Sequence, residues 1–190
     1  MLTRAQALEL IVKEYPREPI VVTLGATARE LAGLYRAPNH LYVLDSMGLP
    51  PAIGLGLALA LAESAFEKVV VVEGDGSLLM GLSTLATMGL TQPKNLVLLV
   101  LDNGVYAATG GQPTAASAVD FVAVARGCGM VAHDIEGAEG FAAALAESRT
   151  IDAPQLLRVR IGTQNVKVPY LLEDPVVLGH TFQQYLRENA

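Results

Sequence analysis

KVVVVEGDGS, residues 68 to 77, joins a run of β-branched residues to a turn in which an aspartate stands between two glycines. Because the run has no polar alternation, it predicts a strand over 68–73 that is covered on both faces of a parallel sheet. Asp75 then follows the end of that strand, with only Gly74 and Gly76 beside it. Ligands of parallel α/β sheets bind at such strand ends, so the turn is a candidate binding site.

The remainder of the chain alternates short apolar runs with longer Ala/Leu/Glu patterns, which indicates strand–helix units around a parallel sheet. We predict strands over 19–24, 41–45, 68–73, 95–102, 130–135 and 154–161. We predict helices over 3–15, 27–36, 51–64, 78–90, 118–127 and 137–148, and a short final helix from about Gly179. The expected fold class is α/β, a three-layer α/β/α arrangement with a central, mostly parallel sheet.

Local signals mark two helix starts and the end of the alternating pattern. Thr27 and Glu30 form a T-x-x-E capping box at the start of the second helix, and Pro51 suits the first turn of the third. From residue 162 onward the alternation stops and apolar residues stand beside prolines. We therefore expect a single domain over 1–190, in which 162–190 is a C-terminal tail that packs on something.

Composition narrows the classes of protein. The chain is 52% hydrophobic and 17% charged, below the roughly 25% charged residues of an ordinary soluble domain, so we expect strands buried on both faces and some surface hidden in an assembly. The apolar stretch GLGLALALAES, residues 54 to 64, fits either close packing or a subunit interface, and the low charge of the chain favours the interface. The net charge of −6 without a basic block argues against nucleic acid and anionic membranes as partners.

Other features favour a cytoplasmic protein. Cys128 is the one cysteine, so it forms no disulfide within the chain and supplies no metal cluster, which suits a reducing compartment. The first residues form an amphipathic helix pattern with charges throughout, unlike a signal peptide. The longest apolar stretch is about half of the ~20 residues that cross a bilayer.

The turn after strand 68–73 combines features that favour phosphate with one that repels it. Gly-rich turns at helix starts present N–H groups to anions, yet Asp75 carries a negative charge, which implies a divalent cation between the two. The next strand ends at Asn103, 28 residues after Asp75, and a right-handed strand–helix–strand unit brings both strand ends to the same edge. Carboxylate, amide and carbonyl oxygens suit Mg²⁺.

GDGS at 74–77 and DNGVY at 102–106, at this spacing, resemble the signature of thiamine diphosphate enzymes, over the diphosphate-binding (PP) domain and nearly the whole chain. The resemblance implies that Asp75, the Asn103 side chain and the Val105 carbonyl bind Mg²⁺. It assigns cofactor binding in this region to Gly74, Asp75, Gly76, Ser77, Asn103, Val105 and Tyr106. Many members carry asparagine where this chain has Asp102, but the implied ligand is the second position of the pair.

Two further stretches agree with this family. LDSMGLPPAIGLGLALA, residues 44 to 60, is similar to the segment that receives the aminopyrimidine ring. By this likeness Met47 matches the bulky residue that bends the cofactor. The carbonyl of Asp45 should face the exocyclic amine of the ring, and Ser46 lies between these two residues. Most relatives carry glycine where Asp45 stands. LGATARE, beginning at residue 24, resembles a second loop that contacts the diphosphate, which implicates Gly25 and Thr27, although Thr27 also suits a helix cap.

LDNGVYAATGGQPTAA, residues 101 to 116, resembles a loop of sulfopyruvate decarboxylase beta subunits and phosphonopyruvate decarboxylases. Both families act on short 2-oxo acids with a second anionic group. Gln112 and Thr114 are candidates for reaching the substrate or closing over the cofactor. The implied function is the diphosphate-binding subunit of a thiamine diphosphate- and Mg²⁺-dependent 2-oxo acid decarboxylase. The alternatives are a subunit of an acetolactate synthase-like carboligase and a non-catalytic cofactor-binding subunit.

The resemblance also implies that this chain is half of an active site. Enzymes of the family activate the cofactor with a glutamate on a separate pyrimidine-binding (Pyr) domain, and the PP domain uses up this chain. No catalytic residue is therefore assigned here, and the activating glutamate is expected on an alpha-type Pyr subunit. We expect a hetero-oligomer with a dimeric or tetrameric core that acts on a small 2-oxo acid and is inactive without its partner chain.

Overall fold

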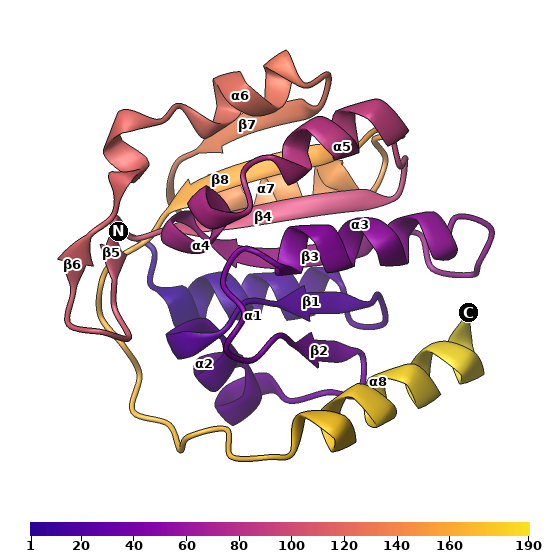
Figure 1. Ribbon diagram of the computed structural model, residues 1–190, viewed down its shortest axis with the longest axis horizontal. Helices are drawn as coiled ribbons and strands as arrows, with labels where there is room; N and C mark the ends of the chain where they lie inside the picture. Colours follow the sequence, from indigo (N-terminus) through magenta and orange to yellow (C-terminus); the bar gives the residue numbers. More distant parts are fainter.

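A computed structural model describes residues 1–190 and centres on a six-stranded parallel sheet (Figure 1). The strand order is β2-β1-β3-β4-β8-β7. Their bounds are β1 Ile20–Val22, β2 His40–Tyr42, β3 Val69–Gly74, β4 Leu96–Asp102, β7 Val131–Ile135 and β8 Gln155–Arg160. All six predicted strands are confirmed. A separate antiparallel hairpin, β5 (Val105–Tyr106) with β6 (Gln112–Pro113), was not predicted, because two-residue strands carry no periodic pattern.

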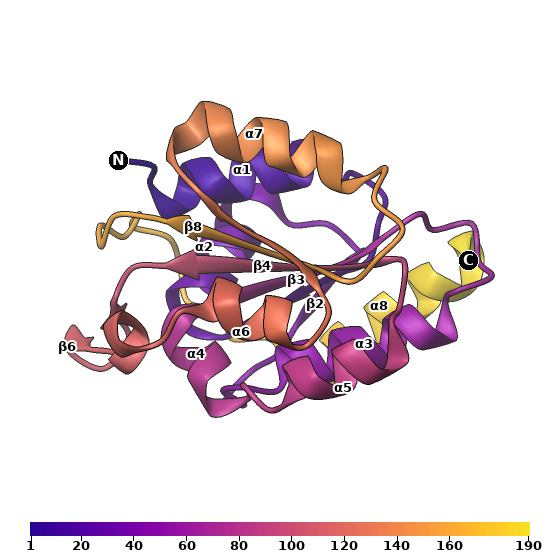
Figure 2. The same ribbon diagram turned by 90° about the horizontal axis from the view of Figure 1, so that it is seen from above.

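Helices cover both faces of the sheet, which confirms the three-layer arrangement (Figure 2). One layer holds α1 (Arg4–Glu14), α2 (Gly25–Tyr35) and α7 (Gly137–Ser148); the other holds α3 (Pro50–Ala60), α4 (Asp75–Met80), α5 (Thr84–Thr91) and α6 (Phe121–Gly127). A 3₁₀ turn, η1 (Ala115–Ala118), precedes α6, and α8 (Pro175–Asn189) ends the chain. None of these helices is long and apolar enough to span a membrane.

The inner strands join the two halves of the hydrophobic core. Every residue of β4 is buried, and so are the valines of β3. Because side chains alternate along a strand, Val70 and Val72 pack in the layer of α1, α2 and α7, while Val69 and Val71 pack under α3 and α5. Fully burying one such side chain stabilises the fold by about 1.5 to 3 kcal/mol, so β3 and the turn that follows it stand on a rigid base.

The predicted helix 78–90 is wrong in its extent. The helix begins earlier, at Asp75, with Gly74 as its N-cap, and it ends at Met80, with Gly81 as its C-cap, before α5 starts. Gly81 lies against the backbone of Gly48: a Cβ on Gly81 would sit 2.1 Å from the Gly48 carbonyl oxygen. The segment before α3 therefore packs where an unbroken helix would pass, which a local sequence pattern does not reveal.

Three other helix starts also differ from expectation. The capping box was wrong: α2 begins at Gly25, two residues before Thr27, and Glu30 bonds to Arg4 instead of to the helix start. The predicted helix 118–127 is η1 followed by α6, whose N-cap Asp120 accepts the Ala123 N–H at 2.9 Å. The final helix starts at Pro175 rather than near Gly179.

The predicted tail packs against this chain itself. Figure 1 shows α8 beside β2 at the edge of the sheet. Before it, Glu173 pairs with Arg36, and Val168 packs against Gly33, where a Cβ would lie 2.7 Å from the Val168 Cβ. The tail therefore covers the β2 edge and the outer side of α2.

The strand order places a topological switch point between β1 and β3. From β1 the chain crosses to β2 on one side, and from β3 it continues to β4 on the other. The loops that leave β1 and β3 therefore diverge, and a crevice forms between them at the carboxyl ends of the strands. Both Gly25 and the Gly74–Ser77 turn lie there.

Candidate functional site

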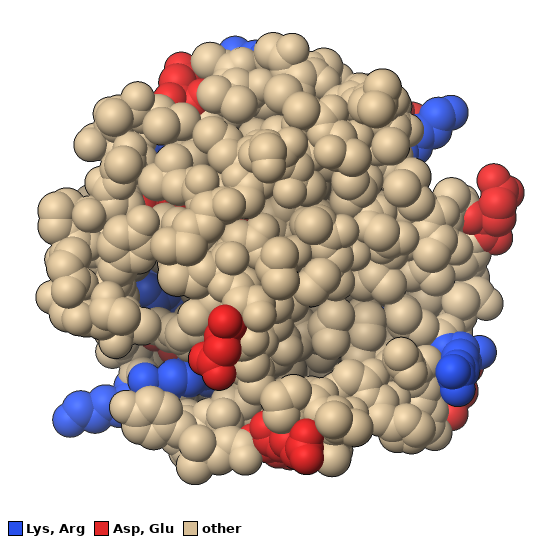
Figure 3. All heavy atoms as spheres, in the orientation of Figure 1, with Lys and Arg blue, Asp and Glu red and all other residues tan.

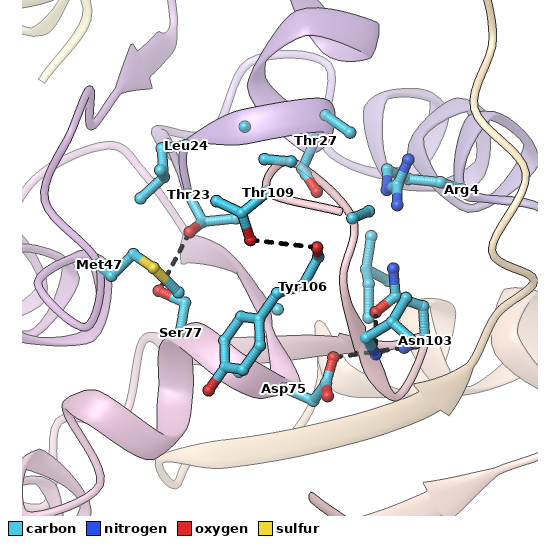
Figure 4. A pocket seen from close by; sticks show the side chains of 18 of the residues that line it. Arg4, Thr23, Leu24, Thr27, Met47, Asp75, Ser77, Asn103, Tyr106 and Thr109 are labelled. Carbon is cyan, nitrogen blue, oxygen red and sulfur yellow. Dashed lines mark hydrogen bonds between the residues drawn. The ribbon is translucent and has the colours of Figure 1, made fainter. Parts of the chain in front are cut away.

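A cavity of about 370 Å³ opens at this switch point (Figure 4). It lies at the carboxyl ends of β1, β3 and β4, and it is also lined by the turn before α3 and by α1. Its lining residues are Arg4, Thr23, Leu24, Gly25, Ala26, Thr27, Met47, Gly74, Asp75, Gly76, Ser77, Met80, Leu101, Asn103, Val105, Tyr106, Ala107, Ala108 and Thr109. Arg4 and Asp75 are the only residues among these that carry a charge near neutral pH.

Asp75 is held in a fixed orientation at the bottom of the cavity. The residue is 2% exposed, its Oδ1 accepts the Asn103 N–H at 3.4 Å and its Oδ2 accepts the Thr114 hydroxyl at 2.5 Å. Burial raises the pKa of Asp75, although the bond from Thr114 acts against that shift. A buried carboxylate is costly to ionise without a compensating positive charge, and a bound cation would supply one.

Two further candidate oxygens come from the segment after β4, whose backbone meets Asp75 through the Asn103 N–H. The Asn103 Oδ1 accepts the Val105 N–H at 3.1 Å, and the Val105 carbonyl accepts the Ala107 N–H at 3.1 Å. Each of these oxygens has a second lone pair for another ligand. A carboxylate, an amide oxygen and a backbone carbonyl form a hard oxygen set, which suits Mg²⁺ and leaves positions for phosphate oxygens and water.

The glycines of the turn leave room for Tyr106 and for a ligand. A Cβ on Gly76 would lie 2.4 Å from the Tyr106 Cε1, so only glycine lets this ring pack over the turn (Figure 4). The first N–H groups of α4 have no partner within the helix. The Ser77 hydroxyl accepts the Gly48 N–H at 2.9 Å and lies 3.3 Å from the Thr23 hydroxyl, which ties the segment before α3 to the turn.

The segment expected at the aminopyrimidine end is only partly in the cavity. Met47 lines it, but neither Asp45 nor Ser46 does, so the structure does not place the predicted Asp45 carbonyl at the cavity. Asp45 is exposed, and its backbone φ of 54° lies in the left-handed region, which favours glycine. Glycine would adopt this conformation without the strain that an L side chain meets there.

The two candidates for substrate contact lie outside the cavity. Gln112 is exposed, and its side chain bonds to Thr109 through both the carbonyl and the hydroxyl of that residue. Thr114 is buried and donates to Asp75. The remaining predicted cofactor residues, Gly25, Thr27, Gly74, Gly76, Ser77, Asn103, Val105 and Tyr106, all line the cavity.

Sequence reasoning missed several polar residues of the site. Thr23 and Thr109 line the cavity, but single threonines after a strand or in a loop carry no distinctive signal. Glu73 is fully buried under the turn; its Oε1 accepts the Gly74 N–H at 2.9 Å, its Oε2 has no partner, and burial raises its pKa to about 7. A glutamate at the end of an apolar strand was the available signal. Arg4 reaches the site from α1, far away in the sequence.

Comparison with known proteins agrees with this geometry. A family model described as "Thiamine pyrophosphate enzyme, C-terminal TPP binding domain" matches residues 23–159. The solved structure of benzoylformate decarboxylase from Polynucleobacter necessarius superposes with a TM-score of 0.71 at 19% identity, covering 85% of this chain and 33% of that one. At that identity the likeness shows the fold alone. The predicted fold class and the resemblance to thiamine diphosphate enzymes are thus confirmed.

Curated relatives are similar over most of this chain. A phosphonopyruvate decarboxylase of Streptomyces viridochromogenes is 46% identical over 84% of this chain and 40% of its own length. The phosphonopyruvate decarboxylase of Streptomyces hygroscopicus is 42% identical over 99% of this chain and 46% of its own length. Sulfopyruvate decarboxylase subunit beta of Methanothermobacter thermautotrophicus is 39% identical over 90% of this chain and 88% of its own length. The chain therefore spans less than half the length of the first two relatives and most of the third.

Proposed function

We infer the function from one premise: the chain belongs to the thiamine pyrophosphate enzyme family, through its C-terminal TPP-binding domain. We propose that residues 1–190 form one PP-type domain, in which 162–190 is a packing tail. We propose further that this domain is the diphosphate-binding subunit of a thiamine diphosphate- and Mg²⁺-dependent 2-oxo acid decarboxylase, a carboxy-lyase of the cytoplasm.

The observation that carries this proposal is the meeting of Asp75 and Asn103 beside a glycine turn. Asp75, Asn103 and the Val105 carbonyl would hold Mg²⁺, and the N–H groups of the Gly74–Ser77 turn would hold the diphosphate. Bound thiamine diphosphate supplies an electron sink for the bond that breaks when a 2-oxo acid loses CO₂.

The other cavity residues would position the cofactor and shield the site. Met47 stands at the opposite end of the cavity from Asn103, where it would support the bent cofactor (Figure 4). Tyr106 packs over the turn and would limit the access of water. Gly25 and Thr27 would close the cavity on the side of β1, and the backbone at Asp45 and Ser46 would face the pyrimidine from beyond Met47.

For the substrate we propose a short 2-oxo acid with a second anionic group. Two kinds of relatives support this choice, because their names refer to phosphonopyruvate and to sulfopyruvate, which differ in that group. The chain is 39% identical or more to an example of each kind.

We propose an alpha-type Pyr subunit as the partner of this chain. The match covers 40% and 46% of the two phosphonopyruvate decarboxylases, whereas it covers 88% of a relative that is named subunit beta. The surface over α3, α4 and α5 is almost free of charged side chains (Figure 3). Its exposed apolar side chains are Leu49, Leu59, Met80 and Leu90. A hetero-oligomer would cover this surface.

Titration calorimetry of the chain with Mg²⁺ and thiamine diphosphate, with and without the Pyr subunit, tests the cofactor proposal. We expect Asp75→Asn to weaken cofactor binding by more than about tenfold, because it removes the charge that holds the metal. Asp152→Asn, an exposed position away from the cavity, is the matched control and should bind like the wild type. Equal affinities of all three proteins would contradict the ligand assignment.

The reaction is tested with the assembled complex and three substrates: sulfopyruvate, phosphonopyruvate and pyruvate. Release of CO₂ from at least one of them, with an aldehyde as product, is the expected result. A product with more carbon atoms than the substrate would indicate a carboligase instead. Cofactor binding without turnover of any substrate would indicate a non-catalytic subunit.

A further inference from the structure

Arg4, the first residue of α1, is a buried cation at the edge of the cavity. It is 3% exposed, and its Nη1 donates to the Glu30 Oε1 at 2.9 Å and to the Asn165 Oδ1 at 2.7 Å. Both bonds use the same nitrogen, so Nε and Nη2 make no hydrogen bond within the chain. The guanidinium therefore keeps hydrogen-bond donors available for a ligand. The other charged residue that lines the cavity is Asp75.

Arg4 lies toward one end of the cavity. Figure 4 shows the guanidinium near Thr27 and above Asn103, whereas Met47 lies at the far side. The end at which Arg4 stands is thus the end of the metal ligands and of the two loops expected to contact the diphosphate.

Local structure gives no reason for a cation here. Arg4 occupies the first turn of a helix, where the helix dipole disfavours positive charge. Its partner Glu30 is 1% exposed and also accepts the Val166 N–H at 3.0 Å, while its Oε2 has no partner. Buried ion pairs of this kind often add little net stability. The pair does hold the guanidinium in one orientation.

We propose that Arg4 binds the diphosphate of the cofactor directly, as a cation in addition to Mg²⁺. This inference rests on the proposed function, since it concerns the same site. A diphosphate carries more negative charge than one divalent ion neutralises, and Asp75 adds another negative charge beside it. Arg4 is the only basic residue that lines the cavity, and a guanidinium offers paired donors that match phosphate oxygens.

The competing explanation is structural. Arg4 connects α1 to Glu30 of α2 and to Asn165 of the tail, so it could serve only to hold these segments together. A variant that removes Arg4 alone leaves Glu30 as a buried charge without its partner, which destabilises the fold by itself. The test must therefore separate the stability of the chain from its affinity for the cofactor.

We would compare Arg4→Gln, Glu30→Gln and the double variant as full chains assembled with the Pyr subunit. Calorimetry gives the Kd of thiamine diphosphate with Mg²⁺ in the absence of any 2-oxo acid, and urea unfolding gives stability. We expect the double variant to regain stability relative to Arg4→Gln, because two neutral amides replace the ion pair. We expect it to bind the cofactor about ten- to a hundredfold more weakly than the wild type. Glu30→Gln, which keeps the arginine, should retain affinity.

Wild-type affinity in the double variant would overturn the inference, and it would mean that Arg4 is structural or contacts the substrate. Failure of the proposed function gives a different result, since the wild-type complex would then bind no cofactor at all. That outcome would overturn both proposals together.

Discussion

Three buried ionisable side chains, Asp75, Glu73 and His40, meet the cost of burial in different ways. Asp75 accepts two hydrogen bonds, from the Asn103 N–H and the Thr114 hydroxyl. Glu73 keeps one oxygen without a partner, and burial raises its pKa to about 7. His40 is 4% exposed in β2, and burial lowers its pKa to about 4. Asp75 lines the cavity and Glu73 is buried in β3 just before the turn, whereas His40 affects the pH dependence of stability.

We expect His40 to destabilise the chain in acid. Between pH 6.5 and about 4 the unfolded chain binds a proton at this histidine while the folded chain does not, so stability falls as the pH falls. Each pH unit corresponds to about 1.4 kcal/mol, and the whole loss approaches about 3 kcal/mol. His40→Gln should reduce the slope of the unfolding free energy against pH over this range, as measured by urea titration. The exposed His133→Gln is the control and should keep the wild-type slope; an unchanged slope in His40→Gln would contradict the expectation.

At the scale of the elements, a side chain of β8 fixes the turn that follows β4. The register pairs Val100 with Arg158, so Asp102 and Arg158 are diagonal neighbours on one face of the sheet. Arg158 donates to the Asp102 Oδ2 through Nε at 2.9 Å and Nη2 at 2.6 Å, and the Asp102 Oδ1 accepts the Gly104 N–H at 2.9 Å. The departure from asparagine at Asp102 is thereby explained: the carboxylate pairs with an arginine and fixes the turn that carries Asn103.

We expect Asp102→Asn to destabilise the chain by about 2 kcal/mol, because it breaks a largely buried, doubly bonded ion pair. Asp134→Asn is the matched control, since Asp134 bonds to the same arginine at 2.8 Å but its side chain is 54% exposed, against 7% for Asp102. Asp134→Asn should lower the free energy of unfolding by less than about 1 kcal/mol. Urea unfolding of both variants measures the difference. Equal losses would show that burial does not distinguish the two carboxylates.

On the scale of the whole molecule, one outer surface is unusual for its lack of charge (Figure 3). On α3 the exposed residues are Ala52, Gly56, Leu59 and Ala60, which recur at helical spacing and form an apolar stripe. Leu49 at the start of α3, Met80 on α4 and Leu90 on α5 extend the same kind of surface. Extended apolar surfaces of this kind mark interaction sites, which agrees with the interface expected from residues 54–64.

We expect Leu59→Glu to weaken assembly with the Pyr subunit by more than about tenfold, because it places a charge in an apolar interface. Leu59 is 47% exposed in the isolated chain, so the free energy of unfolding should change by no more than about 0.5 kcal/mol. Val177→Glu, at a 54% exposed position on α8, is the matched control. Analytical ultracentrifugation of mixed subunits measures both affinities. Assembly of Leu59→Glu at the wild-type affinity would place the interface elsewhere.

Much of the fold could be predicted from local patterns. The six strands are short apolar runs, and the inner pair lacks alternation, so periodicity was enough to find them and to rank them by burial. The proximity of Asp75 and Asn103 followed from strand order and spacing, because they stand at the ends of successive strands. Helix ends were less predictable: the break at Gly81 depends on Gly48, and the start of α2 does not depend on Thr27.

Residues whose role depends on distant contacts emerged only from the tertiary structure. Thr114 was expected in a substrate loop, yet it supports Asp75, and Arg4 reaches the cavity because α1 and α2 pack together. Side-chain periodicity and backbone freedom at glycine act between consecutive residues, so the sequence by itself indicated the sheet and the glycine turn, and the resemblance of its motifs indicated the cofactor family. Long-range packing brings together residues far apart in the chain, and no local pattern records which of them will meet.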